Sequence, residues 1–209
     1  FTQATLVNTS KHSVKDVGDE ALLLAQYAPT IVAQNRADSA KLAEEHNADL
    51  ILMDDGLQNN HLHKNINLLV VDRQIDFGNN RILPAGPLRE PLSDVLDKVH
   101  GIVCIGRPFH SDLNVFESSV TPTEIIDNTS KYIAFAGLGY PDKFKNTLLN
   151  LNIDLVEWHP FPDHHNYTEQ EILQLKDNAH NENAKLITTE KDFIRLPSDL
   201  QENILTLPI

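Results

Sequence analysis

Residues 49–58 read Asp49-Leu-Ile-Leu-Met-Asp54-Asp55-Gly56-Leu57-Gln58. The four apolar residues predict a buried strand, and the two carboxylates follow at its carboxyl end, where open α/β sheets place their ligands. Adjacent carboxylates repel one another unless a cation binds between them, and Mg²⁺ is a hard ion that takes oxygen ligands. The stretch therefore indicates a magnesium site of the kind used in phosphoryl transfer. The alternative interpretation is a strand end followed by an ordinary Asp-Gly turn.

On both sides of this stretch, short apolar runs alternate with helical patterns. The alternation predicts βαβ units, and hence an α/β fold with a mainly parallel sheet and flanking helices. We expect a catalytic-core lobe over residues 1–106, a polar connection over 107–130 and a smaller C-terminal α/β lobe over 131–209. The expected strands cover residues 5–7, 30–34, 49–53, 67–72, 101–105, 132–136, 153–158, 185–189 and 204–207. The expected helices cover residues 21–27, 37–46, 92–99, 141–151 and 168–179.

The charge of the chain limits its partners. Its 209 residues hold 17 Lys and Arg against 30 Asp and Glu, a net charge of −13. So acidic a chain lacks the basic surface that nucleic acid requires, and any contact with anionic lipid must use a local basic patch. No apolar run approaches the roughly 20 residues of a membrane-spanning helix. The single cysteine, Cys104, excludes an intrachain disulfide and is best read as a small core residue.

The stretch Phe77-Gly-Asn-Asn-Arg-Ile-Leu-Pro-Ala-Gly-Pro-Leu-Arg-Glu-Pro91 combines two Gly and three Pro with two Arg. Its backbone is therefore held in an irregular shape that presents guanidinium groups. Arg suits phosphate because its planar fork binds two oxygens at once. The alternative is a structural Ω-loop over the core.

Three polar motifs carry weaker signals. Asp163-His164-His165 precedes a helix and is interpreted as metal ligands, a general acid/base pair or capping residues, with one His acting because consecutive side chains diverge. Gly18-Asp19-Glu20 begins a helix, where acidic residues are explained by the helix dipole alone. Thr188-Thr-Glu-Lys-Asp192 is a strand-to-helix turn whose plain interpretation is a cap.

In combination and order, these motifs closely resemble the tetraacyldisaccharide 4'-kinase family. The resemblance runs from about Val17 to Leu196, and the Leu83–Pro91 run is its most specific part. It implies a P-loop-kinase-like fold at the cytoplasmic face of the bacterial inner membrane. It also implies transfer of the γ-phosphate of ATP to the 4'-hydroxyl of a tetraacylated disaccharide 1-phosphate, giving lipid IV-A in lipid A biosynthesis. The implied partners are this glycolipid and the inner-membrane surface.

The resemblance also assigns roles. Asp54 and Asp55 match the family's Mg²⁺-binding pair. Asp19 matches a carboxylate that acts in a dyad with a His of the Asp-His-His motif, either His164 or His165. In the implied mechanism Asp19, tuned by the His, accepts the proton of the sugar hydroxyl. Positions associated with phosphate and nucleotide binding match Arg36, Arg89 and Glu90.

The sequence departs from the family pattern at peripheral positions, with Asn59 for His, and Ala21 and Asn166 for Pro. The family's membrane anchor and its Gly-rich phosphate-binding loop are expected before Phe1, and no G-x-x-x-x-G-K-[ST] motif occurs in these residues. We therefore expect these 209 residues alone to bind ATP weakly. Two alternatives remain: an inactive remnant of such a kinase, and a metal-dependent phosphoesterase that uses Asp54, Asp55 and the Asp-His-His motif.

Overall fold

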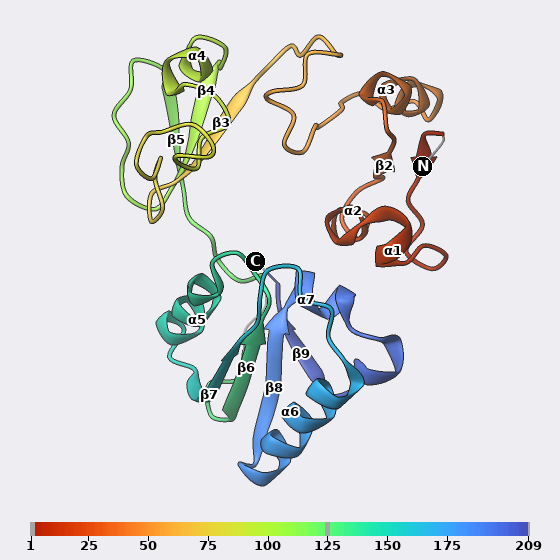
Figure 1. Ribbon diagram of the computed structural model, residues 1–209, viewed down its shortest axis with the longest axis vertical. Helices are drawn as coiled ribbons and strands as arrows, with labels where there is room; N and C mark the ends of the chain where they lie inside the picture. The colour runs from red at the N-terminus through yellow and green to blue at the C-terminus, as the bar shows by residue number, and fades with distance from the viewer. Residues whose placement is uncertain (1–2, 124–125, 209) are drawn as a thin grey trace. The chain divides into compact units, whose positions relative to one another are not determined.

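The computed structural model describes residues 3–123 and 126–208 (Figure 1). The chain forms two compact units. One unit combines Phe1–Gln34 with Pro122–Ile209, and the other comprises Asn35–Thr121. The first 34 residues thus group with the C-terminal lobe, whereas the sequence suggested that they belong with the residues that follow them.

The C-terminal lobe is built on a four-stranded sheet in which every neighbouring pair is parallel. The parallel strands and their helices confirm the predicted α/β class. The order across the sheet is β7 (Asp154–Pro160), β6 (Lys131–Ala136), β8 (Ala184–Thr189) and β9 (Ile204–Leu207).

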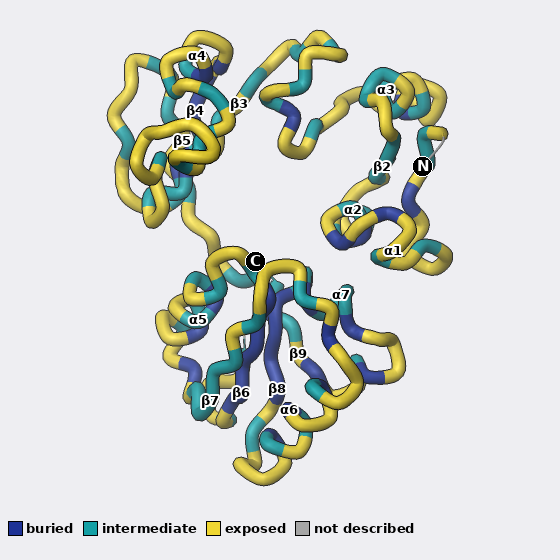
Figure 2. The backbone as a smooth tube through the Cα atoms, viewed as in Figure 1, coloured by how far each residue is buried: buried dark blue, intermediate teal, exposed yellow. Residues whose placement is uncertain are grey.

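Successive side chains of β6 point to opposite faces of the sheet. Each of the two faces is covered by a helix. Ile133 and Phe135 pack in a cluster with α6 (Glu169–Asn181), whereas Tyr132 and Ala134 pack with α5 (Pro141–Asn150). Strand β6 is buried from its second residue, Tyr132, to its end at Ala136, and Figure 2 shows it largely in the colour of buried residues. The sheet is therefore a rigid platform for the loops at its edge.

The N-terminal segment is held by short elements. Strands β1 (Thr5–Leu6) and β2 (Ile31–Val32) form an antiparallel pair, and α1 (Val14–Val17) leads into α2 (Asp19–Leu24). The buried Val17 and Leu22 form a small cluster against which Ile194 of α7 (Glu190–Arg195) packs. This contact joins α2 to the C-terminal lobe. A 3-10 turn, Ser198–Leu200, precedes β9.

The second unit contains a smaller parallel sheet, in the order β3 (Leu68–Asp72), β4 (Gly101–Ile105) and β5 (Asn114–Ser118). It also contains α3 (Arg36–Glu45) and α4 (Leu92–Leu96). Strand β5 lies within residues 107–130, which were expected to form a polar connection, and it was not among the predicted strands. Its apolar residues are few, and its strand character comes from pairing with β4. Cys104 of β4 is fully buried, as expected of a core residue.

The strand predicted over residues 49–53 is also wrong. Leu50, Ile51 and Leu52 are 75%, 44% and 86% exposed, and no strand forms there. Within the described ranges no neighbouring strand pairs with this run, so its backbone groups have no ladder to join. Asp54 and Asp55 consequently lie on an exposed turn and not at the end of a buried strand.

No helix among the described residues is long and apolar enough to cross a membrane.

The platform role of the C-terminal sheet is tested by two adjacent leucines of α5. Leu148 is fully buried against the sheet, whereas Leu149 is 48% exposed. We expect Leu148→Ala to lower the free energy of unfolding by about 2–5 kcal/mol, because it leaves a cavity in the core. Leu149→Ala, the matched control, is expected to change it by less than about 0.5 kcal/mol. Urea unfolding measures both; equal losses would contradict the assigned packing.

Candidate active site

The predicted site residues of the first unit gather at the carboxyl edge of the four-stranded sheet. After β6 the chain crosses to β7 on one side, and after β8 it crosses to β9 on the other. The loops that follow β6 and β8 therefore diverge, and this is the position at which parallel α/β sheets usually bind their ligands.

A buried carboxylate, Asp192 of α7, organises this edge. It is fully buried and accepts hydrogen bonds from the Gly137 N–H (3.0 Å), the Tyr167 hydroxyl (2.9 Å) and Thr189 Oγ1 (2.6 Å). Burial, together with the nearby charge of Asp192, raises the pKa of Tyr167. The Tyr167 phenol thus remains protonated and donates its hydrogen bond. The donors to the Asp192 carboxylate lie at or after the carboxyl ends of three strands.

Gly137 is tightly enclosed at the end of β6. A Cβ atom there would lie 3.0 Å from the carbonyl oxygen of Pro162 and 3.1 Å from the Cβ of His165. The Gly137 carbonyl oxygen also accepts the backbone N–H of His164 at 3.2 Å. The close approach of these two loops sets the position of the Asp-His-His motif.

Arg195 connects Asp192 to the surface of the lobe. Its NH1 group donates to the Gly137 carbonyl (2.9 Å) and to Asp192 Oδ1 (3.2 Å). Its Nε group donates to Asp19 Oδ2 at 2.7 Å, and its NH2 group donates to the same oxygen. The side chain is only 4% exposed, so these bonds hold the guanidinium in one place.

Asp19 is the first residue of α2 and is itself almost buried. Its Oδ1 accepts the backbone N–H of Glu20 at 2.9 Å. Burial by itself would raise the pKa of Asp19. The hydrogen bonds and charge of Arg195 outweigh this effect, with help from the charge of Lys191 and the Glu20 N–H, and the pKa is lowered. Asp19 is therefore an ionised, strongly hydrogen-bonded carboxylate.

The two histidines point to different partners. His164 Nδ1 lies 3.2 Å from Asp19 Oδ2, and its side chain is 58% exposed. His165 instead places Nε2 3.1 Å from the carboxylate of Glu171 in α6 and stacks on Phe161, with ring centroids 4.8 Å apart. The structure thus places His164, and not His165, beside Asp19. The sequence left this choice open because it depends on a positive φ of 54° at His164.

The remaining predicted site residues belong to the second unit. Arg89 NH1 pairs with Asp55 Oδ2 at 2.6 Å, and both side chains are more than half exposed. Glu90 accepts from Gln58 Nε2 (3.0 Å) and pairs with Lys98 (2.5 Å). The hydrogen bonds from Lys98 and then Gln58 lower the pKa of Glu90. The stretches 54–58 and 89–90 are therefore in direct contact.

The Gly- and Pro-rich loop is closed on itself. The backbone of Leu83 donates to Leu88 at 2.8 Å, and that of Leu88 donates to Arg81 at 3.1 Å. A Cβ atom on Gly86 would lie 2.0 Å from Asn79 Oδ1. This close packing explains the composition of the loop and brings its end, with Arg89, to Asp55.

Arg36 begins α3 and is half-buried. Within the described part of the chain, neither Arg36 nor Asp54 forms an ion pair or hydrogen bond with another predicted site residue. Nor does that part contain a cluster of three or more His, Cys, Asp or Glu suited to a metal. Two exposed carboxylates nevertheless fit Mg²⁺, which takes one or two carboxylates and completes its shell with water and phosphate.

Several residues of the site were missed by sequence reasoning. The expected cap at residues 188–192 is confirmed, because Thr189 Oγ1 accepts the backbone N–H of Asp192. The cap interpretation did not reveal the second role of Asp192 as a buried anchor. Arg195 carried only one signal, its position one helical turn after Asp192. In the second unit, Lys64 Nζ donates to the carbonyls of Gly56 (3.1 Å), Leu57 (3.3 Å) and Asn59, and so holds the turn after Asp55.

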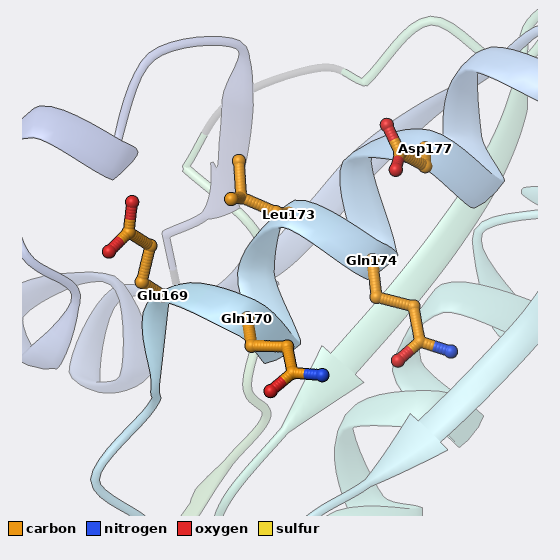
Figure 3. A pocket seen from close by; sticks show the side chains of 5 residues that line it. All are labelled: Glu169, Gln170, Leu173, Gln174 and Asp177. Atoms are coloured by element: carbon orange, nitrogen blue, oxygen red, sulfur yellow. The ribbon is translucent and has the colours of Figure 1, made fainter.

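A surface hollow elsewhere on the lobe has none of these features. It lies along the outer side of α6 (Figure 3), and its lining side chains all come from that one helix. They are Glu169, Gln170, Leu173, Gln174 and Asp177. We assign it no role.

The parallel sheets and the carboxylate–imidazole–guanidinium group at a sheet edge define an α/β protein with the features of an enzyme. The family model described as tetraacyldisaccharide-1-P 4'-kinase matches residues 2–209. The chain belongs to this family.

Individual relatives agree. The tetraacyldisaccharide 4'-kinase of Parvibaculum lavamentivorans is 44% identical over 201 residues, which cover 91% of this chain and 59% of the relative. The tetraacyldisaccharide 4'-kinase of Gluconobacter oxydans is 38% identical, and the match covers 97% of this chain and 65% of the relative. A solved structure of LpxK from Aquifex aeolicus, in its "apo" form in complex with ATP, matches with a TM-score of 0.72 and 27% identity. That match covers 99% of this chain and 69% of the solved chain. The chain therefore spans less than two thirds of the length of these two curated relatives.

A double-mutant cycle tests the pair Asp19–Arg195. We expect Asp19→Asn or Arg195→Gln alone to cost about 3 kcal/mol of stability at neutral pH, because each leaves a poorly solvated charge without its partner. The double variant should cost less than the sum of the two. The pair Glu20–Lys191, which joins the same two helices, is the matched control; its Glu20 side chain is 62% exposed, and about 0–1 kcal/mol is expected.

The coupling should also depend on pH. Because the folded-state pKa of Asp19 is lowered, the contribution of its ion pair to the free energy of unfolding is fully present above the ordinary aspartate pKa of about 4. It is lost as the pH falls through the lower, folded-state value. The coupling is measured from the urea midpoints of the unaltered protein, the two single variants and the double variant between neutral and acid pH. A coupling that grows in acid would contradict the ion pair.

Proposed function

We propose that this protein transfers the γ-phosphate of ATP to the 4'-hydroxyl of a tetraacyldisaccharide 1-phosphate. The proposal rests on one observation: within a chain matched by the family model over residues 2–209, His164 lies against Asp19. Phosphoryl transfer requires little covalent chemistry from the protein beyond positioning, charge stabilisation and acceptance of the hydroxyl proton. A carboxylate in contact with an imidazole can accept this proton.

Asp54 and Asp55 are the proposed Mg²⁺ ligands. When bound there, the ion would neutralise charge on the phosphates of ATP. Arg89 now pairs with Asp55 at the surface, so it can move to a phosphate oxygen at little energetic cost. We assign Arg36 and Glu90 to the same phosphate and nucleotide region.

The substrate class suggests where the reaction takes place. A tetraacylated glycolipid resides in a membrane, so we propose that the protein meets it at the cytoplasmic face of the bacterial inner membrane. With a net charge of −13, the protein must approach anionic lipid through a local basic patch. The alternative of an inactive remnant is disfavoured, because such a remnant has no reason to retain Asp19 and His164 in contact.

The two histidines give the sharpest test of the reaction. We expect His164→Ala to lower kcat by about 10²–10⁴-fold, the range that a positioned acid–base group contributes. His165→Ala should reduce stability, because it loses the contacts with Phe161 and Glu171, but should alter kcat far less. The assay measures phosphate transfer from ATP to tetraacyldisaccharide 1-phosphate by the full-length protein. Absence of transfer by the unaltered protein would contradict the proposed function.

The metal assignment has its own test. Chelation of divalent ions should abolish transfer, and Asp54→Asn or Asp55→Asn should raise the Mg²⁺ concentration needed for half-maximal rate. Asp49→Asn is the control, because this exposed aspartate lies five residues before Asp54 and is assigned no role. Isothermal titration with Mg²⁺ and ATP provides a second readout, independent of turnover. Equal Mg²⁺ dependence of all three variants would exclude these ligands.

A further inference from the structure

We propose that Lys64 is a positioning residue for the turn that carries Asp54, Asp55 and Gln58. Its ammonium group holds the backbone of that turn, and the proposed reaction depends on Lys64 only through the side chains of the turn. The inference rests on the proposed kinase function and refines it. It adds to the phosphate and nucleotide region a residue that none of the sequence motifs contains.

The Lys64 ammonium group is bound by backbone carbonyls. Lys64 Nζ donates to the carbonyl oxygens of Gly56 at 3.1 Å and Leu57 at 3.3 Å, and it also donates to that of Asn59. A lysine ammonium has three N–H donors, so these bonds use its whole capacity. None of its acceptors among the described residues is a carboxylate. The charge therefore holds the backbone of the turn and not a neighbouring side chain.

This arrangement argues against Lys64 as a direct phosphate ligand. To bind a phosphate oxygen, the part-buried ammonium would have to leave carbonyl oxygens that it now satisfies, and an unsatisfied polar group in such a place is costly. Arg89 differs, because its bond to Asp55 is exposed and can be exchanged at little cost. Lys64 is therefore suited to hold the turn while Arg89 is free to move.

The turn needs such support because it has little of its own. Residues 50–53, which lead into it, form no strand. Asp55 has a positive φ of 50°, and the Asn59 N–H donates to the Gly56 carbonyl at 3.1 Å. Hydrogen bonds from a charged donor are roughly twice as strong as such neutral bonds. The three bonds from Lys64 are therefore the main restraint on the backbone after Asp55.

Lys64 lies close in sequence to a fixed part of the small sheet. Asn67, three residues later, donates its backbone N–H to His100 Nδ1 at 3.0 Å and accepts the His100 N–H at its carbonyl at 2.8 Å. Asn67 Nδ2 also donates to the Lys98 carbonyl at 3.0 Å. These bonds fasten the chain just before β3 to the chain just before β4. Lys64 thus connects the turn to the sheet.

The other side of the turn is held from the same place. Gln58 Nε2 donates to Glu90 Oε1 at 3.0 Å, and Lys98 Nζ pairs with Glu90 Oε2 at 2.5 Å. Lys98 therefore binds Glu90 with its side chain and Asn67 with its carbonyl. Together with the bonds of Lys64, these contacts close a circuit around the turn. Loss of Lys64 opens the circuit and leaves the turn held at one side only.

Hydrogen exchange of the full-length protein, followed by NMR, tests this contact independently of catalysis. Lys64→Met keeps an apolar stem but removes the charge. We expect the Asn59 N–H to exchange at least about 10-fold faster in this variant, the factor that one hydrogen bond to a charged group contributes. The amides of β4 should be unaffected, which shows that the variant is folded. Unchanged exchange at Asn59 would overturn the proposal, whether or not the protein is an active kinase.

Kinetics give the second readout. We expect Lys64→Met to lower kcat about 10- to 100-fold, because displacement of reacting groups by about 1 Å costs about 100-fold in rate. Lys64→Arg keeps a cation with several N–H donors and should retain more of the rate; equal losses in the two variants would contradict the role of the charge. Lys41→Met, which removes an exposed lysine of α3 in the same unit, is the matched control and should leave kcat unchanged.

A double-mutant cycle with Asp55→Asn separates positioning from a general loss of stability. If Lys64 acts through the turn, Lys64→Met should lower kcat far less in the Asp55→Asn protein than in the unaltered one. Effects that multiply, or a folded Lys64→Met protein with a normal rate, would refute the role of Lys64 and leave the proposed function standing. Absence of transfer by the unaltered protein would refute the function instead, and hydrogen exchange would still decide the contact.

Discussion

The candidate site depends on one buried charge. Asp192 is fully enclosed, and an enclosed carboxylate is stable only if its oxygens are satisfied by hydrogen bonds and an opposite charge. Its donors come from Gly137 after β6, from Tyr167 after β7, from Thr189 at the end of β8 and from Arg195 of α7. A single side chain therefore fixes the relative positions of three segments at this edge of the sheet.

The same constraint reaches the N-terminal segment through Arg195. A guanidinium has five N–H donors in a rigid fork, so one end can be fixed by buried acceptors while the other binds a second carboxylate. Here the fixed end binds Asp192 and Gly137, and the free end binds Asp19, which lies 176 positions away in sequence. The short helix α2 has little stability of its own, since isolated helices of this length do not form in water. Its position follows from this ion pair and from the packing of Leu22.

The parts of the fold that the sequence predicted well are those in which local pattern and burial agree. Strand β6 is apolar from Tyr132 to Ala136, and α6 begins at a Thr168/Glu171 capping box that the structure contains. The strand predicted at residues 49–53 failed because an apolar run becomes a strand only beside a partner. Strand β5 was missed for the converse reason, since its pairing with β4 compensates for a polar composition. Both errors concern long-range pairing, which a local pattern does not encode.

The same limit, that a local pattern does not encode long-range contacts, applies to the candidate site. Motifs predicted which residue types matter, but not which atoms meet. The choice between His164 and His165 depends on one backbone angle and on the stacking of His165 against Phe161. Arg195 gave almost no signal, because its importance comes from acceptors contributed by β6 and α2.

The motifs that run in one order along the chain belong to two different compact units. Gly-Asp-Glu, Asp-His-His and Thr-Thr-Glu-Lys-Asp lie in one unit, whereas the Asp54-Asp55 turn and the Arg89 loop lie in the other. The two groups also differ physically. Asp19 is held by buried partners, and its bonds cannot be exchanged cheaply; the Asp55–Arg89 pair is exposed and exchanges at little cost. A carboxylate that takes part in proton transfer benefits from the first property, because misplacement of reacting atoms by about 1 Å costs about 100-fold in rate. Groups that receive a nucleotide and its metal benefit from the second, because they must release one partner to bind another. The proposed kinase reaction would therefore use a preorganised carboxylate–imidazole pair and an exchangeable phosphate site.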